Sequence, residues 1–311
     1  MSQCLLGYIR DNVETEKSPR YSVAGSSNNC NEGVAAACNT PFYRGFNQTE
    51  KDDIVNEHNR LRNIVALGKE SRGNPGPQPS AANMNKIVMY FRISGKLGSW
   101  DDELAGIAQR WVDQCQIDHD SCRRCERFNV GQNICMSGST IHHSFDPSSQ
   151  VKAFYDEVKY FNRTDVNCFN IPEPNSEVVG HYTQVVWADT TLVGCGLIYY
   201  PDGVWNIYYM ACNYGPAGNI IGDSLYKEGT PCSECAGGCD ITYTGLCAHD
   251  NRRLQMATLQ DVKVSAVYTW GVGKPLKPTQ ASPSPPLLIH TIVPAYSSPM
   301  ASLVLTDSWQ P

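Results

Sequence analysis

The chain has 311 residues, of which 41% are hydrophobic and 18% charged, and its formal net charge is −6. This length and composition suit a folded globular protein and exclude a wholly disordered chain. With 25 basic and 31 acidic residues, the sequence lacks the basic excess that a nucleic-acid-binding surface requires. No apolar run approaches the roughly 20 residues of a membrane-spanning helix, so we expect no transmembrane segment.

The 14 cysteines are the most informative number in the composition. A high, even count favours disulfides formed in an oxidising, extracellular compartment. Two N-glycosylation acceptor sequences, at Asn47 and Asn162, point the same way. The N-terminus shows no secretory signal pattern, because its short apolar stretch around Leu5 and Leu6 is followed by a charged run. We therefore expect residues 1–28 to be unstructured or to reflect an incorrect gene start.

The first predicted helix begins at residues 49–52 (TEKD), where an acid follows Thr49 by three positions as in a capping box. Its apolar stripe recurs at helical spacing and consists of Ile54, His58, Leu61 and Val65. Gly68 is typical of the position just after a helix. Because His58 lies on this stripe, we expect it to pack in the core.

Two more helices follow. The second begins near Trp100, where acids suit a helix N-terminus. Its predicted buried residues are Leu104, Ile107, Ala108, Trp111 and Cys115. The third begins at Asp146-Pro147, a cap followed by proline at the first helical position, and its apolar residues repeat from Val151 to Phe161.

The chain then changes to strand-forming residues. Residues 192–200 and 204–214 are rich in β-branched and aromatic side chains, and a Pro-Asp-Gly turn at 201–203 joins them as a hairpin. Helices packed on an antiparallel hairpin sheet predict an α+β or layered α/β/α domain.

Residues 229–247 form a different unit with few large apolar residues, and we expect disulfides to hold it together. Its cysteines are Cys232, Cys235, Cys239 and Cys247. The Cys232-x-x-Cys235 spacing also suits a zinc site, but the oxidising context favours disulfides. Residues 248–311 contain no cysteine and many prolines, which predicts a disordered tail. We thus predict a main domain at 29–228, a hinge-like extension at 229–247 and the tail.

Three motifs resemble those of the CAP superfamily, which includes cysteine-rich secretory proteins, antigen 5 and plant pathogenesis-related proteins. Residues 180–190 (GHYTQVVWADT) resemble its first signature and residues 209–220 (YMACNYGPAGNI) its second. Residues 58–62 (HNRLR) match its HNxxR helix motif. Residues 73–79 (GNPGPQP) and 100–105 (WDDELA) resemble the arthropod venom allergen 5, or antigen 5, subfamily in particular.

This resemblance implies a three-layer α/β/α sandwich with a groove that holds two histidines and two acidic residues. By motif, the histidines are His119 and His181, and the helix acid is Glu157. The second acid usually lies in a Gly-Glu-Asn sequence, where this chain has Gln132. The purely structural alternative is that the two histidines form a hydrogen-bonded pair that stabilises the groove.

Two neutral imidazoles can bind Zn²⁺, so His119 and His181 are candidate ligands for zinc or another divalent cation, bound weakly and not required. A catalytic zinc normally has three protein ligands and a water. Gln132 also removes a charge and a candidate general base, while Glu157 can still orient a histidine. No Gly-x-Ser-x-Gly motif occurs near His181, and we predict no catalytic residue.

The resemblance also implies disulfides. Cys195 and Cys212 match a family bridge across the hairpin. Cys115 and Cys122 match cysteines that tether the N-terminal loop, with Cys30 and Cys38 as partners in an undetermined order. Four cysteines remain unassigned, namely Cys4, Cys125, Cys135 and Cys168.

The resemblance implies that the protein is a secreted, extracellular antigen 5-like protein of the venom or salivary allergen type. By resemblance it acts by binding a host or extracellular protein, or a small lipid or sterol, rather than as an enzyme. One alternative is an ion-channel-modulating cysteine-rich secretory toxin, which the lack of cysteines after Cys247 disfavours. The other is a metal-dependent hydrolase or protease, which Gln132 disfavours.

Overall fold

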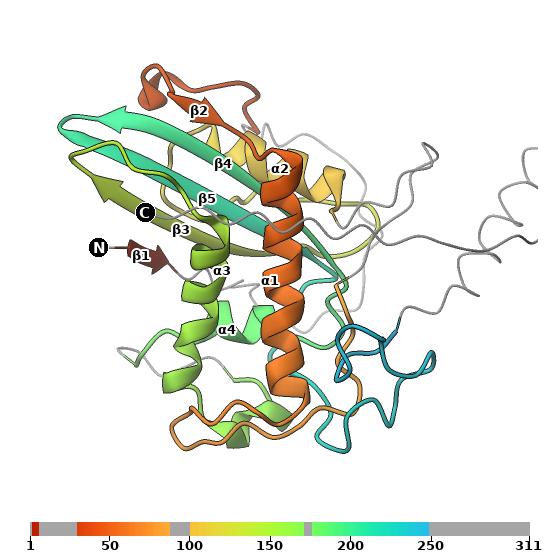
Figure 1. Ribbon diagram of the computed structural model, residues 1–311. Helices are drawn as coiled ribbons and strands as arrows, with labels where there is room; N and C mark the ends of the chain where they lie inside the picture. Colours follow the sequence, from red (N-terminus) through yellow and green to blue (C-terminus); the bar gives the residue numbers. More distant parts are fainter. Residues whose placement is uncertain (1, 6–29, 88–99, 171–175, 249–311) are drawn as a thin grey trace, which may run out of the picture. The chain divides into compact units, whose positions relative to one another are not determined.

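The computed structural model describes residues 2–5, 30–87, 100–170 and 176–248 (Figure 1). The chain divides into a unit Met1–Met256 and a unit Ala257–Pro311, and the second lies wholly outside the described residues. The described helices are α1 (Gln48–Ala66), α2 (Asp102–Val112), α3 (Pro147–Tyr155) and α4 (Gly180–Val185). The described strands are β1 (Ser2–Leu5), β2 (Tyr43–Arg44), β3 (Gly131–Ser139), β4 (Leu192–Asp202) and β5 (Trp205–Gly215). Short 3₁₀ helices cover Ala36–Cys38, Asp156–Tyr160 and Arg163–Asn167.

The strands form one sheet in the order β1-β3-β5-β4-β2, and every neighbouring pair is antiparallel. β4 and β5 make the predicted hairpin, whose turn uses Gly203 at a positive φ of 59°. A residue without a Cβ adopts that backbone conformation at little cost. β3, which was not predicted from the sequence, pairs with β5 over its whole length and places Gln132 opposite Asn213.

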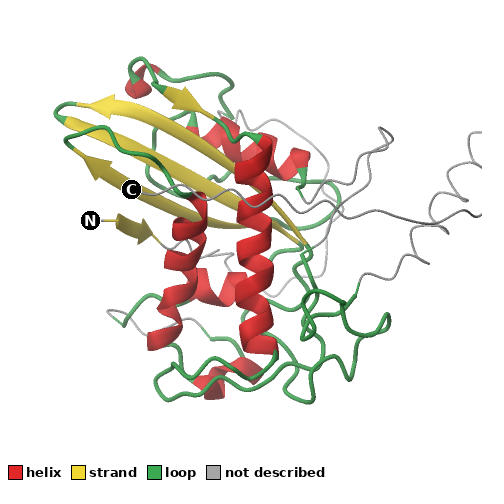
Figure 2. Ribbon diagram, viewed as in Figure 1, coloured by secondary structure: helices red, strands yellow, loops and turns green. Residues whose placement is uncertain are grey.

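Helices cover both faces of the sheet (Figures 1 and 2). Alternate residues of β4 point to opposite faces, as in any strand. Leu197 and Tyr199 belong to a core shared with α1, α3 and α4, whereas Ile198 and Tyr200 belong to a second core that contains Ala108 and Val112 of α2. The predicted three-layer α/β/α sandwich is therefore confirmed.

The first two helix starts show how local sequence sets the boundaries. α1 begins two residues earlier than predicted, because Asn47 and not Thr49 is its cap. The Asn47 side chain accepts a hydrogen bond from the Glu50 backbone N–H at 3.0 Å, and the Glu50 carboxylate accepts one from the Asn47 N–H at 2.8 Å. α2 begins as predicted, with the Asp101 carboxylate accepting from the Leu104 N–H.

The third helix is shorter than its apolar repeat suggests. Asp146 caps α3 and Pro147 occupies its first turn, as predicted. The α-helical hydrogen bonding ends at Tyr155, and residues Asp156–Tyr160 continue as a 3₁₀ helix. Glu157 lies in this 3₁₀ segment, and its carboxylate contacts the first turn of α4.

Five disulfides join described cysteines. Two of them are the predicted bridges that tether the N-terminal loop. The pairs are Cys30–Cys122, Cys38–Cys115, Cys195–Cys212, Cys232–Cys239 and Cys235–Cys247. The last two use all four cysteines of residues 229–247, so none of these thiolates is left to bind zinc. Cys125 and Cys168 form no disulfide with another described residue, and Cys4 is the register partner of Cys135 between β1 and β3.

Residues 229–247 pack on the sandwich rather than standing apart from it. Leu246 has no exposed surface and belongs to the same core as α1 and α3. The Gly245 N–H donates to Asn63 of α1 at 2.8 Å, and Lys86 forms an ion pair with Asp240 at 2.8 Å. The segment therefore contributes one buried side chain to the domain core in addition to its disulfides.

The two chain ends are described only in part. Within the N-terminal segment expected to be unstructured, Ser2–Leu5 pair with the outer edge of β3 as β1, because an edge strand offers unpaired backbone groups. The rest of that segment to residue 28, and the predicted tail apart from Ala248, lie outside the described residues. Across the described parts of the chain, no helix combines the length and apolar character that crossing a bilayer requires.

Candidate functional site

The four predicted groove residues come together as two contacting pairs. His119, in the loop after α2, contacts Gln132 of β3, with Nδ1 and Oε1 3.0 Å apart. His181, in the first turn of α4, contacts Glu157, with Nδ1 and Oε1 2.6 Å apart. Asn133, next to Gln132, donates from its side-chain amide to the His181 carbonyl at 3.1 Å and so links the pairs. We call these four residues the His119–His181 cluster.

The orientation of the Gln132 amide is fixed by its neighbours. Oε1 accepts from the Asp120 backbone N–H at 3.0 Å, and a backbone amide can only donate. Nε2 donates to Oδ1 of Asn213 at 3.0 Å, and Asn213 in turn donates to the Leu104 carbonyl at 3.2 Å. Because Oε1 of Gln132 is an acceptor, the contact with His119 requires Nδ1 of the imidazole to carry the proton.

This tautomer leaves Nε2 of His119 as a bare acceptor. Nε2 is buried and has no hydrogen-bond partner among the described residues. Burial, with the nearby positive charge of Arg123, lowers the pKa of His119 to about 4, and His181 contributes in the same direction. The imidazole is therefore neutral at pH 7. A buried lone pair with no partner is costly unless a ligand satisfies it.

The second pair is held by a carboxylate with several partners. Oε2 of Glu157 accepts from the His181 backbone N–H at 3.0 Å and from the Tyr182 N–H at 3.3 Å, while Oε1 meets the imidazole. This places a negative charge at the N-terminus of α4, where the first N–H groups need acceptors. The Phe154 ring stacks on the His181 ring with centroids 5.1 Å apart. Glu157 thus fixes Nδ1 of His181 by a hydrogen bond.

His58 lies outside this cluster and has the packing role its position predicts. It has no exposed surface, its Nδ1 donates to the Ile54 carbonyl at 2.7 Å, and its Nε2 accepts from the Tyr214 hydroxyl at 2.9 Å. Burial lowers its pKa to about 4. His58 is a neutral core residue with both ring nitrogens engaged.

The donor set of the cluster fits a loosely held divalent cation better than a catalytic one. The Nε2 atoms of His119 and His181 are the nitrogen ligands that Zn²⁺ prefers, and each imidazole is oriented by a partner on Nδ1. No group of three or more His, Cys, Asp or Glu side chains arranged to hold a metal occurs in the described ranges. Two protein ligands are one fewer than a catalytic zinc site usually has.

Sequence reasoning missed the residues that orient Gln132. Asn213 lies in the second signature, but its contact with Gln132 depends on β3 pairing with β5. The acceptor geometry at Gln132 depends on the backbone N–H of Asp120, which no residue type reveals. The second signature was the only available indication of Asn213.

Residues 55–214 match the sequence profile of the cysteine-rich secretory protein, or CAP, family. The match covers more than half of the chain, and together with the sandwich fold it shows that the chain belongs to this family. The chain is an antigen 5-like member, and curated proteins similar to it are named venom allergen 3 or venom allergen 5.

Two of these relatives are insect venom allergens. The chain is 46% identical to venom allergen 3 of Solenopsis invicta over 185 residues, which are 59% of this chain and 74% of that protein. It is also 46% identical to a venom allergen 5 of Vespula maculifrons over 183 residues, which are 59% of this chain and 82% of that protein.

Solved structures agree with the fold. The crystal structure of NaASP2 with Zn²⁺ superposes with a TM-score of 0.53 at 30% identity, covering 66% of this chain and 97% of that one. The structure of BmVAL-1 has a TM-score of 0.53 at 25% identity and covers 68% of this chain and 98% of that one.

Proposed function

We propose that the protein is a secreted, extracellular CAP protein that acts by binding a ligand or a host factor rather than by catalysis. The disulfides support an oxidising compartment, because such bonds rarely persist in the cytosol. The buried, unsatisfied Nε2 of His119 is the single observation that carries the binding role.

The ligand at the cluster is a divalent cation such as Zn²⁺, held weakly by His119 and His181. The related crystal structure of NaASP2 with Zn²⁺ supports this choice. The test is calorimetric titration with Zn²⁺ of the wild type, a His119→Ala, His181→Ala double variant, and a His142→Ala control that removes a histidine outside the cluster. Binding should be lost in the double variant and kept in the control. Equal affinity in wild type and double variant would exclude the cluster as the cation site.

The side chains of the cluster support binding rather than catalysis. Gln132 cannot act as a general base, and both oxygens of Glu157 already accept hydrogen bonds from the start of α4 and from His181. Peptide and ester hydrolysis should therefore proceed at the same background rate with the Zn²⁺-loaded wild type and with the double variant. Turnover that depends on His119 and His181 would contradict the binding role.

The biological partner is a host or extracellular protein, or a small lipid or sterol. Mass spectrometry of lipid extracted from protein secreted by animal cells, with metal analysis of the same sample, distinguishes these classes. A stoichiometric lipid would identify a lipid carrier. Protein free of lipid would favour a protein partner.

A further inference from the structure

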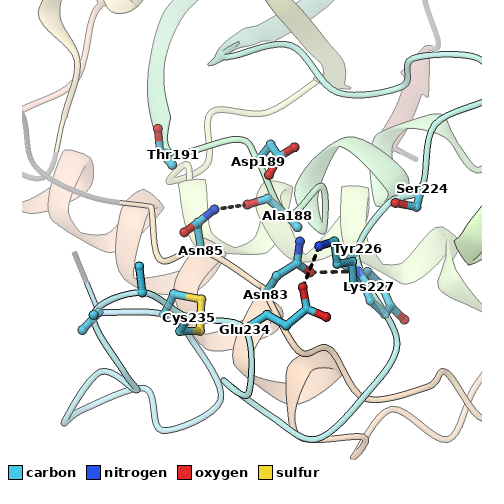
Figure 3. Close-up of a pocket in the computed structure, with 14 residues that line it drawn as sticks. Asn83, Asn85, Ala188, Asp189, Thr191, Ser224, Tyr226, Lys227, Glu234 and Cys235 are labelled. Carbon is cyan, nitrogen blue, oxygen red and sulfur yellow. Dashed lines mark hydrogen bonds and ion pairs between the residues drawn. A yellow bond between two sulfur atoms is a disulfide. The ribbon is translucent and has the colours of Figure 1, made fainter. Parts of the chain in front are cut away.

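A cavity of about 600 Å³ lies away from the His119–His181 cluster, where residues 229–247 meet the sandwich (Figure 3). One wall consists of Asn83 and Asn85, before the second helix, and of Asp189 and Thr191, just before β4. The opposite wall consists of Glu234 and the disulfide-bonded Cys235 and Cys247. The size lies within the range of small-molecule sites.

The two asparagine side chains are fixed so that each turns one free polar atom to this cavity. Oδ1 of Asn83 accepts from the Lys227 backbone N–H at 2.8 Å, which leaves Nδ2 as a donor. Nδ2 of Asn85 donates to the Ala188 carbonyl at 3.0 Å, which leaves Oδ1 as an acceptor. Figure 3 shows both amides held in this way beside the cavity. No hydrogen bond to another described residue uses either remaining atom.

Three further polar groups line the same cavity. The Asp189 carboxylate and the hydroxyls of Thr191 and Ser224 form no side-chain hydrogen bond within the described parts of the chain. Lys227 and Glu234 pair with each other, with Nζ and Oε2 2.6 Å apart. The cavity therefore offers donors and acceptors together, and Asp189 leaves it with one net negative charge.

The apolar part of the lining offers little surface to a large apolar ligand. The apolar side chains at the wall are small, namely Ala188, Ala236 and Ala248. Tyr226 is 1% exposed, and its hydroxyl already donates to the Pro79 carbonyl, so its ring forms a closed part of the wall. A sterol or fatty acid would leave the surrounding amides and carboxylate unsatisfied, which is unfavourable.

We propose that this cavity binds a hydroxyl-rich ligand of the carbohydrate class, of the size of a hexose unit. A sugar hydroxyl both donates and accepts, so neighbouring hydroxyls can meet Nδ2 of Asn83 and Oδ1 of Asn85 together. A carboxylate such as Asp189 accepts from two adjacent hydroxyls. The site is independent of the His119–His181 cluster and of the cation.

The experiment is an NMR titration of the full chain with glucose, galactose, mannose and N-acetylglucosamine, each added separately. At least one sugar should give saturable shifts of the Asn83 and Asn85 side-chain amides. Asp189→Ala should weaken that sugar about tenfold or more, since it removes a charged hydrogen-bond acceptor. Asp53→Ala is the matched control, because Asp53 is exposed on α1 and lines no part of the cavity. Its affinity should equal that of the wild type.

Asp189 makes no side-chain hydrogen bond to another described residue, but its negative charge favours the buried guanidinium of Arg62, so its replacement should lower the thermal midpoint. Asn83→Ala therefore provides the second variant, and it should also weaken the sugar. The proposal is overturned if none of the four sugars gives saturable shifts. It is also overturned if shifts lie away from Asn83 and Asn85, or if the affinity is the same in wild type and both variants.

Discussion

Two imidazoles in this protein are kept neutral by burial, yet they differ in one hydrogen bond. His58 uses both ring nitrogens, through Ile54 and Tyr214, whereas Nε2 of His119 has no partner among the described residues. Burial lowers the pKa of each to about 4. A histidine that is fully satisfied stabilises the core, while one with a bare lone pair is available to a ligand.

Both histidines should make stability fall at acidic pH. In the unfolded chain a histidine takes up a proton near its ordinary pKa of 6.5, and folded His58 does so only near 4. Stability is therefore complete above pH 6.5 and is lost as the pH falls from 6.5 to 4, by up to about 3 kcal/mol for His58. Urea unfolding across that range measures the loss. A native His58 ring that titrates near 6.5 by NMR would contradict this account.

Gln132→Glu should raise the affinity for the cation and lower the stability of the fold. A carboxylate accepts more strongly from Nδ1 of His119 and so raises the basicity of Nε2, which should tighten Zn²⁺ about tenfold. The same carboxylate cannot donate to Oδ1 of Asn213, so the free energy of unfolding should fall by about 1–3 kcal/mol. Calorimetry and urea unfolding measure the two effects. Weaker Zn²⁺ binding in Gln132→Glu would show that His119 is not oriented through this residue.

The acceptor sequence at Asn47 is compatible with both a helix cap and a glycan. The cap uses Oδ1 of Asn47, whereas N-glycosylation would modify Nδ2, and Asn47 is exposed. We predict a glycan on Asn47 in protein secreted from animal cells, detected as a mass shift removed by an N-glycosidase. Asn47→Asp should lose the glycan and keep the cap. Asn47→Ala should also lose about 1 kcal/mol of stability. An unmodified peptide that contains Asn47 would refute the prediction.

The residue types and their motifs were enough to locate His119, Gln132, Glu157 and His181. They were not enough to predict the direction of each hydrogen bond, because that depends on the backbone N–H of Asp120 and the side chain of Asn213, which the fold brings to Gln132. The tautomer of His119 is therefore a property of the fold. The place of the residue in the groove could be predicted, but its protonation could not.

At the scale of elements, α2 lies unusually close to the sheet, and two glycines allow it. A Cβ on Gly194 would lie 2.3 Å from the Ala105 N, and one on Gly196 would lie 2.4 Å from the Gln109 N. Real Cβ atoms do not approach backbone so closely, so a larger residue must push the helix away. Gly194 and Gly196 fix the distance between α2 and β4.

A pair of glycine-to-alanine changes tests this packing. Gly196→Ala should destabilise by about 3 kcal/mol or more, because the displaced atoms belong to helix backbone. Gly106→Ala is the matched control, since Gly106 is exposed on α2 and a Cβ there meets nothing within 4 Å. It should stabilise by up to about 1 kcal/mol. Equal effects of the two changes in urea unfolding would disprove the close approach.

Local patterns predicted the helices and the hairpin, but not β3 or α4. β3 reads GQNICMSGS, with few β-branched residues, and it is a strand because it pairs with β5. α4 has only six residues, too few for a periodic pattern, and Glu157 supplies the acceptors at its start. Elements that depend on distant partners carry little local indication of their structure.

At the scale of the whole molecule, the disulfides between described cysteines fall into three groups by location. Two disulfides hold the irregular segment before α1 to the residues after α2, one joins β4 to β5, and two close residues 229–247. That last segment also buries Leu246 in the domain core. We expected residues 229–247 to have no core of their own. This agrees with the structure, because Leu246 packs in the core of the sandwich.

We propose that His119 and His181 bind one cation through their Nε2 atoms. ¹⁵N NMR of the histidine side chains during a Zn²⁺ titration tests it most directly. We predict that the Nε2 resonances of His119 and His181 shift along one saturation curve, while Nδ1 of each stays protonated. Unchanged resonances at these two residues, or a response confined to His142 and His143, would contradict the account.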